Sequence, residues 1–265
     1  MKKKPKKTKT NLNTEKDQHL LKDKKIIEKE ISLAEIKDKD KIIEIGGGKG
    51  YLTEKLAKTN VSKILCFEID ENFKSYLDGL EKKYKNLEIK YGNALKTSWE
   101  DYNKIISNIP YSISEPLINK SIKSKQEKLV LIVGEKFKEK LDTKNKKSTI
   151  GIISNLFYDI KAIKKIPKEK FTPPPRIDSW LIVLNKKTLS KADKIEKILM
   201  EIIQYRGKIK NAIIWALIWE AGKTKNQARD LMKKMKIKKQ VLEKPTTRIT
   251  GKFILKLKEE LPSYL

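Results

Sequence analysis

Cysteine and histidine are almost absent from this chain of 265 residues, which contains one of each. The single cysteine, Cys66, excludes an intramolecular disulfide, and one Cys with one His leaves too few soft ligands for a structural zinc site. No apolar run approaches the ~18 residues that would span a bilayer, and lysines follow Met1. We therefore expect a metal-free protein of the reducing cytoplasm that is neither membrane-spanning nor secreted.

Acidic residues are also few, with 34 Asp and Glu against 62 Lys and Arg, so the formal net charge is +28. Such an excess favours a polyanionic partner, either nucleic acid or an acidic membrane surface. Hydrophobic residues make up 38% of the chain, which is enough for a packed interior and argues against global disorder.

The positive charge is unevenly distributed. Residues 1–10 hold six lysines and no acid, which predicts a disordered basic arm. Residues 186–265 carry +13, and residues 11–185 carry only +9. The composition therefore predicts a basic arm at 1–10, a nearly ordinary globular domain at 11–185 and a basic domain at 186–265.

Short apolar runs alternate with amphipathic stretches before residue 186, which predicts an α/β fold with a mostly parallel sheet. The predicted strands are Lys41–Ile45, Lys63–Phe67, Leu87–Tyr91, Lys104–Ser107 and Lys128–Val133, followed by an edge hairpin of Asp159–Ile166 and Ser179–Leu184. After residue 186 the apolar residues repeat at helical spacing and predict a small helical bundle. Trp215 and Trp219 lie four residues apart, and we assign them to the core of that bundle.

A glycine loop, Glu44–Gly50, follows the first predicted strand and opens a helix, as in nucleotide cofactor sites of doubly wound sheets. A dinucleotide fingerprint would need glycine at position 51, where Tyr51 stands, so an NAD site is disfavoured. Glu68 ends the next strand 20 residues after Gly48, where a carboxylate can accept hydrogen bonds from ribose hydroxyls. The loop and Glu68 together predict a nucleoside cofactor.

The turn Ser107–Tyr111 follows the fourth predicted strand and lies at the same edge of the sheet as the glycine loop. An amine conjugated to an aromatic ring is a poor nucleophile, and two acceptors aimed at its hydrogens would draw it toward a tetrahedral geometry. The Asn108 side-chain oxygen and the Ile109 carbonyl can be these acceptors. Pro110 stiffens the turn, and Tyr111 can stack on a flat base.

With these motifs the chain resembles the KsgA-type rRNA adenine N6,N6-dimethyltransferases of the archaeal and eukaryotic branch, which are related to the erythromycin-resistance methyltransferases. The resemblance rests on Asp17–Asp23, Glu44–Gly48, Phe67–Glu68, Gly92–Leu95, Asn108–Tyr111, Phe171–Ser179 and Gln204–Ala212. It implies a Rossmann-like S-adenosylmethionine-dependent methyltransferase sheet with a small C-terminal helical domain.

The resemblance also implies roles for individual residues. Catalytic roles fall on Asn108, Ile109, Pro110, Tyr111 and Phe171, with Tyr111 and Phe171 sandwiching a flipped adenine. Roles in binding S-adenosylmethionine fall on Gln18, His19, Leu21, Gly46, Gly48, Glu68, Asn93 and Asn108, and no residue is assigned to a metal. Two positions depart from the commonest pattern, since His19 replaces Asn and Asn93 replaces Asp. An uncharged Asn93 implies weaker cofactor binding.

The implied function is N6-dimethylation of two adjacent adenines near the 3′ end of small-subunit rRNA during ribosome biogenesis, by a monomer acting on a pre-ribosomal particle. Basic residues of the helical region, densest at Lys233–Lys239, would contact phosphates. Three alternatives stay open: a non-catalytic assembly factor, favoured by Asn93; a large-subunit rRNA methyltransferase, disfavoured by Gln204–Ala212; and, remotely, an NAD oxidoreductase.

Overall fold

The computed structural model describes residues 18–142 and 147–265, and the predicted basic arm at 1–10 lies outside them. The chain separates into two compact units. The first comprises the chain up to Lys138 together with Lys161–Asn185, and the second comprises Glu139–Ile160 together with Lys186–Leu265. The division into domains at residue 186 stays a prediction. The contacts group residues 139–160, which the sequence analysis placed in the first domain, with the C-terminal helices, because α6 (Thr149–Phe157) packs on α11 (Gly251–Glu260).

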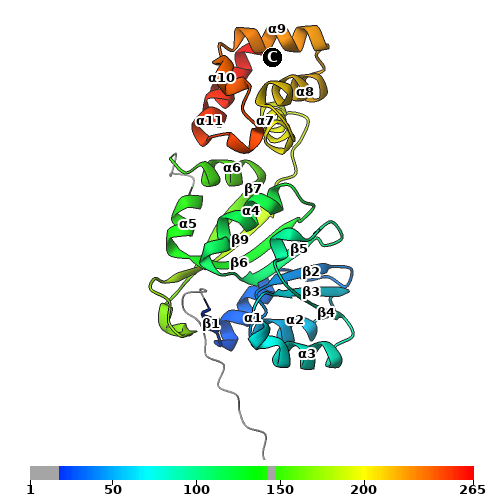
Figure 1. The fold of residues 1–265 in the computed structure, drawn as a ribbon, viewed down its shortest axis with the longest axis vertical. Coiled ribbons are helices and arrows are strands. Elements are labelled where there is room, and N and C mark those ends of the chain that lie inside the picture. Colours follow the sequence, from blue (N-terminus) through cyan, green and yellow to red (C-terminus); the bar gives the residue numbers. More distant parts are fainter. Residues whose placement is uncertain (1–17, 143–146) are drawn as a thin grey trace, which may run out of the picture. The chain divides into compact units, whose positions relative to one another are not determined.

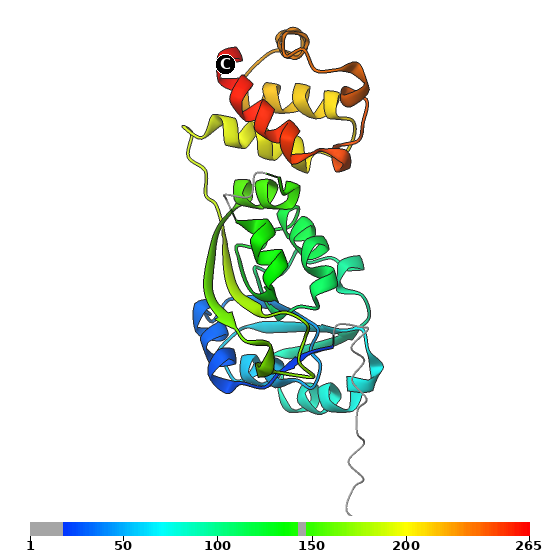
Figure 2. The same cartoon turned by 90° about the vertical axis from the view of Figure 1, so that its left-hand side faces the viewer.

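A sheet of seven strands in the order β4-β3-β2-β5-β6-β9-β7 dominates the fold (Figure 1). The strands β2 to β6 are mutually parallel, and β9 runs antiparallel to β6. Figure 2 shows β7 and β9 as two long neighbouring strands. The bounds are β2 Lys41–Ile45, β3 Lys63–Glu68, β4 Leu87–Tyr91, β5 Lys104–Asn108, β6 Lys128–Gly134, β7 Tyr158–Ile166 and β9 Ser179–Lys186. A separate two-stranded sheet pairs β1 (Leu20–Leu21) with β8 (Phe171–Thr172).

Helices follow the parallel strands in sequence, as their crossovers require. They are α2 Tyr51–Ala57, α3 Lys74–Lys83, α4 Ser114–Ile122 and α5 Glu135–Leu141, while α1 Lys24–Leu33 precedes β2. Short 3-10 turns lie at Glu71–Phe73, Ala94–Lys96, Tyr111–Ile113 and Lys168–Lys170. Each central strand is apolar and buried on both faces, for example Ile42 and Ile43 on β2. The predicted α/β class with a mostly parallel sheet is confirmed.

The second unit is helical, as the sequence predicted after residue 186. Besides α6 and α11 it contains α7 Lys194–Gln204, α8 Ile209–Ala221, α9 Lys225–Lys234 and α10 Lys239–Leu242, and 3-10 turns at Thr246–Arg248 and Leu261–Tyr264. The Thr224 hydroxyl and the Gln227 side chain form a capping box on α9, and the Thr250 hydroxyl caps α11. None of the described helices is long and apolar enough to cross a membrane.

The assignment of Trp215 and Trp219 to the bundle core is wrong. Their exposed fractions are 44% and 65%. The buried face of α8 is made instead by Ile209, Ala212, Ile213, Ala216 and Leu217. Because α8 is apolar on both sides, a four-residue spacing could not show which side packs on the neighbouring helices.

Two carboxyl groups, Glu30 and Glu44, are buried close to each other. Glu30 of α1 is fully buried, and neither of its carboxyl oxygens has a hydrogen-bond partner within residues 18–142 and 147–265. Burial raises the pKa of Glu30 well above its ordinary value, and the nearby Glu44 adds to that effect. Burial also raises the pKa of Glu44 to about 8. Both groups therefore bind protons in the folded chain that they release on unfolding at neutral pH.

These two groups predict a pH-dependent stability. A carboxyl group whose pKa is higher in the folded chain than in the unfolded chain contributes to stability at low pH. This contribution is complete below the unfolded pKa of 4.5 and is lost as the pH rises toward the folded pKa. Glu30→Leu should raise the free energy of unfolding at pH 8 by about 1–3 kcal/mol, because it removes a buried polar group without partners. Urea unfolding between pH 5 and pH 9 checks this.

Glu30→Gln is the matched control, since it removes the titration and keeps an unpartnered polar group. It should flatten the pH dependence with a smaller gain in stability than Glu30→Leu. A loss of stability in Glu30→Leu would mean that Glu30 has a stabilising partner.

Candidate active site

A cavity of about 280 Å³ lies at the carboxyl ends of the parallel strands. After β2 the chain continues toward one side of the sheet, and after β5 it continues toward the other side. The cavity lies where these two directions diverge, which is the usual ligand site of such sheets. Eighteen residues line it: Gln18, His19, Leu20, Ile45, Gly46, Gly48, Phe67, Glu68, Ile69, Phe73, Gly92, Asn93, Ala94, Leu95, Asn108, Pro110, Ser112 and Ile113.

Ser107 joins the two strands that diverge at this cavity. Its hydroxyl donates to the Ile45 carbonyl at 2.5 Å and accepts from the Ile45 amide at 3.2 Å. The glycine loop and the Asn108–Tyr111 turn are adjacent at this point. A Cβ atom built on Gly46 would lie 3.7 Å from Pro110 Cδ and 3.9 Å from the Asn108 carbonyl oxygen. Gly46 has a φ of +86°, which disfavours any side chain there.

Glu68 forms the floor of the cavity beside the glycine loop. Its Oε2 accepts from the Gly48 amide at 2.7 Å, and its Oε1 accepts from the Ile69 and Asp70 amides at 2.8 Å each. Burial raises the pKa of this carboxyl group, while the three amides oppose the rise. A carboxylate has about four acceptor sites, so three amides leave about one for a ligand hydroxyl.

Asn108 presents the most informative atom of the site. Its side-chain oxygen is buried and has no hydrogen-bond partner among the described residues. A buried acceptor without a partner costs about 1–3 kcal/mol, and one explanation for keeping it at the lining of a cavity is that a ligand or water completes it. Asn108 therefore fits an acceptor that awaits a donor in the cavity.

The Tyr111 ring lies against Gly134, where an added Cβ would come within 3.2 Å of Tyr111 Cγ. The Tyr111 hydroxyl and the Ser179 hydroxyl are 2.6 Å apart. The His19 ring stacks on Tyr111 with a centroid distance of 6.2 Å, and its Nδ1 donates to the Pro173 carbonyl at 2.8 Å. His19 thus connects the cavity to Tyr111 and to the segment that follows β8.

The structure brings most of the predicted site residues together. Eight of them line the cavity: Gln18, His19, Gly46, Gly48, Glu68, Asn93, Asn108 and Pro110. Four do not: Leu21 and Phe171 are 3% and 5% exposed and belong to the hydrophobic core, Ile109 is 3% exposed, and Tyr111 lies behind the lining. Leu20 lines the cavity in place of Leu21, because neighbouring residues of a strand point to opposite faces.

Sequence reasoning missed the apolar part of the lining. Ile69 is 70% exposed although it directly follows a buried strand, and Phe73, Leu95 and Ile113 also line the cavity. A large aliphatic residue exposed beside a ligand carboxylate is suited to cover the flat face of a base. The only available signal was the position of Ile69 immediately after Glu68.

Lys120 of α4 supports the wall that contains Asn93, Ala94 and Leu95. Its ammonium group donates to the carbonyls of Ala94 at 3.2 Å and Leu95 at 2.8 Å and to that of Thr97, and it lies 4.3 Å from the centroid of the Trp99 ring. Burial lowers the pKa of Lys120. Asn93 Oδ1 accepts from the Leu95 amide at 2.9 Å, so the turn is fixed from both ends.

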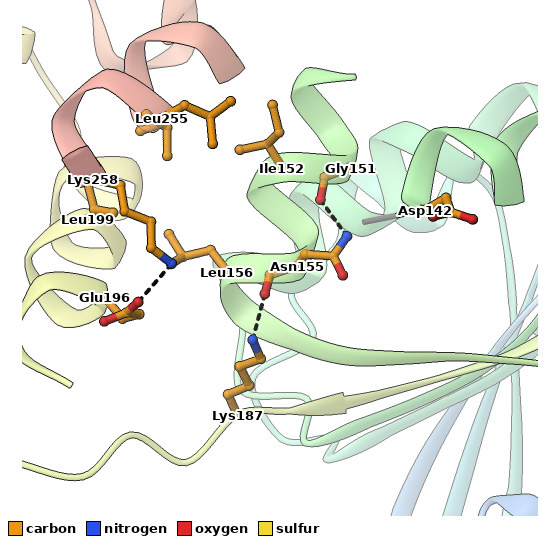
Figure 3. A pocket seen from close by; sticks show the side chains of 11 residues that line it. Asp142, Gly151, Ile152, Asn155, Leu156, Lys187, Glu196, Leu199, Leu255 and Lys258 are labelled. Atoms are coloured by element: carbon orange, nitrogen blue, oxygen red, sulfur yellow. Dashed lines mark hydrogen bonds and ion pairs between the residues drawn. The ribbon is translucent and has the colours of Figure 1, made fainter. Parts of the chain in front are cut away.

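A second cavity, of about 220 Å³, lies in the helical unit between α6, α7 and α11 (Figure 3). Several of its polar side chains already have partners: Lys258 pairs with Glu196 at 2.9 Å, and Lys187 donates to the backbone carbonyl of Asn155 at 2.7 Å. Asn155 in turn donates to the Gly151 carbonyl at 2.8 Å. This cavity offers neither a glycine loop nor an unpartnered acceptor like Asn108, so the first cavity is the candidate site.

The strand order, the reversed β9 and the cavity at the divergence of β2 and β5 define the Rossmann-like methyltransferase class. The crystal structure of the 23S rRNA methyltransferase ErmE has this fold, with a TM-score of 0.59 and 18% identity over 92% of this chain and 99% of that one. A dimethyladenosine transferase from Plasmodium falciparum matches with a TM-score of 0.62 and 27% identity over 93% and 98% of the two chains.

Sequence comparison gives the family. The family model of the ribosomal RNA adenine dimethylases matches residues 9–249, and the chain belongs to this family. A probable ribosomal RNA small subunit methyltransferase A from Methanococcus maripaludis is 32% identical over 86% of this chain and 89% of its own length. One of the same description from Pyrococcus abyssi is 31% identical over 72% and 71%. The resemblance stated from the motifs is confirmed.

The three bonds made by Lys120 predict a specific effect on cofactor binding. Lys120→Met should weaken S-adenosylmethionine binding about tenfold or more, because charge-assisted hydrogen bonds contribute about 1.5–3 kcal/mol and the wall they fix lines the cavity. The rate at saturating cofactor should change little. Calorimetry and steady-state kinetics with varied cofactor separate the two effects.

Lys123→Met is the matched control, because Lys123 is an exposed lysine at the end of the same helix. It should leave cofactor affinity unchanged. Equal affinities in the two variants would show that Lys120 does not position the wall.

Proposed function

We propose that this protein transfers methyl groups from S-adenosylmethionine to N6 of two adjacent adenines near the 3′ end of small-subunit rRNA. It would act as a monomer on a pre-ribosomal particle in the cytoplasm. The family membership and the names of the archaeal relatives support the reaction and the RNA. The observation that carries the proposal for the site is the buried, unpartnered oxygen of Asn108 in the cavity.

The residues of the cavity fit S-adenosylmethionine. Glu68 would accept from a ribose hydroxyl with its remaining acceptor site, and Gly46 and Gly48 let the backbone approach the ligand. Ile69 and Leu95 would cover the adenine of the cofactor, with the Asn93 amide at its edge, and Gln18 and His19 would lie by the methionine part. When bound, the cofactor supplies an electrophilic methyl group on a sulfonium.

Asn108 would orient the target. Its Oδ1 accepts a hydrogen bond from the N6 amine of the adenine, and the Ile109 carbonyl serves as the second acceptor. Two acceptors hold both amine hydrogens and free the nitrogen lone pair from the ring for attack in line. No general base is needed, since the methylated amine is cationic and releases its proton to water afterwards.

Tyr111 would stack on the flipped adenine, because its ring is held in place by Gly134 and the Ser179 hydroxyl. Phe171 would have to turn out of the core to complete a sandwich, since it is 5% exposed. We therefore give the stacking role mainly to Tyr111 and keep Phe171 as a candidate for the second face.

Asn108→Ala tests the chemical step. It should lower the methylation rate at least a hundredfold, comparable to the loss of one donor from an oxyanion hole, while RNA affinity stays within about threefold. Asn119→Ala is the control, because Asn119 is an exposed asparagine eleven residues further on, in α4. Near-normal turnover by Asn108→Ala would refute the mechanism.

The substrate is tested by methylating small-subunit particles in vitro and mapping the products by mass spectrometry. We expect two neighbouring dimethyladenosines near the 3′ end of the rRNA. Methylation of large-subunit RNA instead would support the erythromycin-resistance type of activity. Cofactor binding without any methylation would support a non-catalytic assembly factor.

A further inference from the structure

Helix α8 carries an exposed aromatic surface that the proposed reaction does not use. The Trp215 and Trp219 rings lie with their centroids 5.3 Å apart, and Tyr205 lies 6.3 Å from Trp215. We refer to Tyr205, Trp215 and Trp219 as the aromatic ridge. The 44% and 65% exposure of the two tryptophans leaves large apolar faces in water.

The ridge is not needed for packing. The opposite face of α8 packs on α7 and α9 through residues that are at most 1% exposed, such as Ile213 and Leu217. Adjacent exposed tryptophans on a helix whose core face is already complete form the kind of apolar patch that marks an interaction surface. The Tyr205 ring can occupy its observed position because residue 207 is glycine. A Cβ atom at position 207 would come within 2.8 Å of the Tyr205 ring.

The charge beside the ridge indicates the partner. Arg206 and Lys208 are exposed directly before α8, and the nearest acids in the sequence are Glu201 and Glu220, at the two ends of the stretch that contains the ridge. Lys208 and Lys210 share a single carboxylate, Glu243, at 2.8 Å and 2.7 Å, so their combined charge is only half neutralised. Residues 186–265 as a whole carry +13. Exposed aromatic rings next to unneutralised cations match single-stranded nucleic acid, whose bases stack and whose phosphates are anionic.

We propose that the aromatic ridge stacks on unpaired bases of the RNA substrate and so binds a single-stranded segment of it. The proposal rests on the proposed function for the identity of the RNA. Stacking on the ridge would select RNA with unpaired bases, whereas the lysines of 233–239 would bind phosphates of any RNA.

The test is a binding measurement with two RNA probes. One is a hairpin of the small-subunit 3′-end sequence with a loop of unpaired bases, and the other is a fully paired duplex of the same length. Trp219→Ala and Trp215→Ala should each weaken hairpin binding about five- to 150-fold, the range seen when one stacked base loses its aromatic partner. Duplex binding and the slope of log K against log salt should stay unchanged. Trp219→Phe should recover most of the affinity.

The control exchanges Lys233, Lys234, Lys236, Lys238 and Lys239 for Gln. It should weaken binding to both RNAs and reduce the salt slope. If the tryptophan variants bind the hairpin normally, or lose both RNAs equally, the ridge does not stack on unpaired bases and the proposal is overturned. Binding is measured without turnover. If the protein methylates no RNA, the proposed function is refuted, but the binding measurement can still be interpreted.

Fluorescence of the RNA-free protein tests the other possible occupants. The ridge tryptophans should emit at long wavelength and be quenched by acrylamide, in comparison with a Trp215→Phe, Trp219→Phe double variant, and the hairpin should shield them. If the ridge tryptophans are shielded without RNA, a second copy or another part of the chain covers the ridge. A sedimentation coefficient that falls in the tryptophan variants would mean the same. Either result overturns the proposal.

Discussion

The separation of β2 from β5 is the constraint on which the site depends. The two strands are paired in parallel at Ile42 and Ile43, and their chains then continue to opposite sides of the sheet. The Ser107 hydroxyl, which donates to and accepts from Ile45, joins the strands at the last point before they part. Beyond it, the glycine loop and the Asn108–Tyr111 turn no longer pair with each other, and the cavity is lined by residues of both.

The surroundings of this opening are fixed by groups bonded mainly to the backbone. Three backbone amides orient Glu68, and three carbonyls surround the Lys120 ammonium. Such bonds restrict the movement of the residues that line the cavity, so these residues need not become ordered when a ligand binds. The one buried side-chain polar atom of the lining without a partner, within the described residues, is the Asn108 oxygen.

The sequence predicted the fold well where local pattern and packing agree. Strands β2 and β4 begin and end at the predicted residues, because short β-rich runs bounded by charged or glycine residues have few alternatives. The polar residues of the site were also predictable, since their chemistry defines motifs. Ile69 and Lys120 were not, because a single aliphatic or basic residue has no signature without its neighbours in space. The two-residue strand β1 was missed because it exists only through its pairing with β8, some 150 residues later.

That pairing has a consequence for how the protein is made. His19 and Leu20 belong to the rim of the cavity, but the groups that hold them, the Pro173 carbonyl and β8, are translated after almost all of the sheet. During synthesis the central parallel strands can assemble first, while the rim waits for the chain near residue 173. The lining of the cavity is therefore completed late, and a nascent chain interrupted before that point would lack the contacts that hold His19 and Leu20.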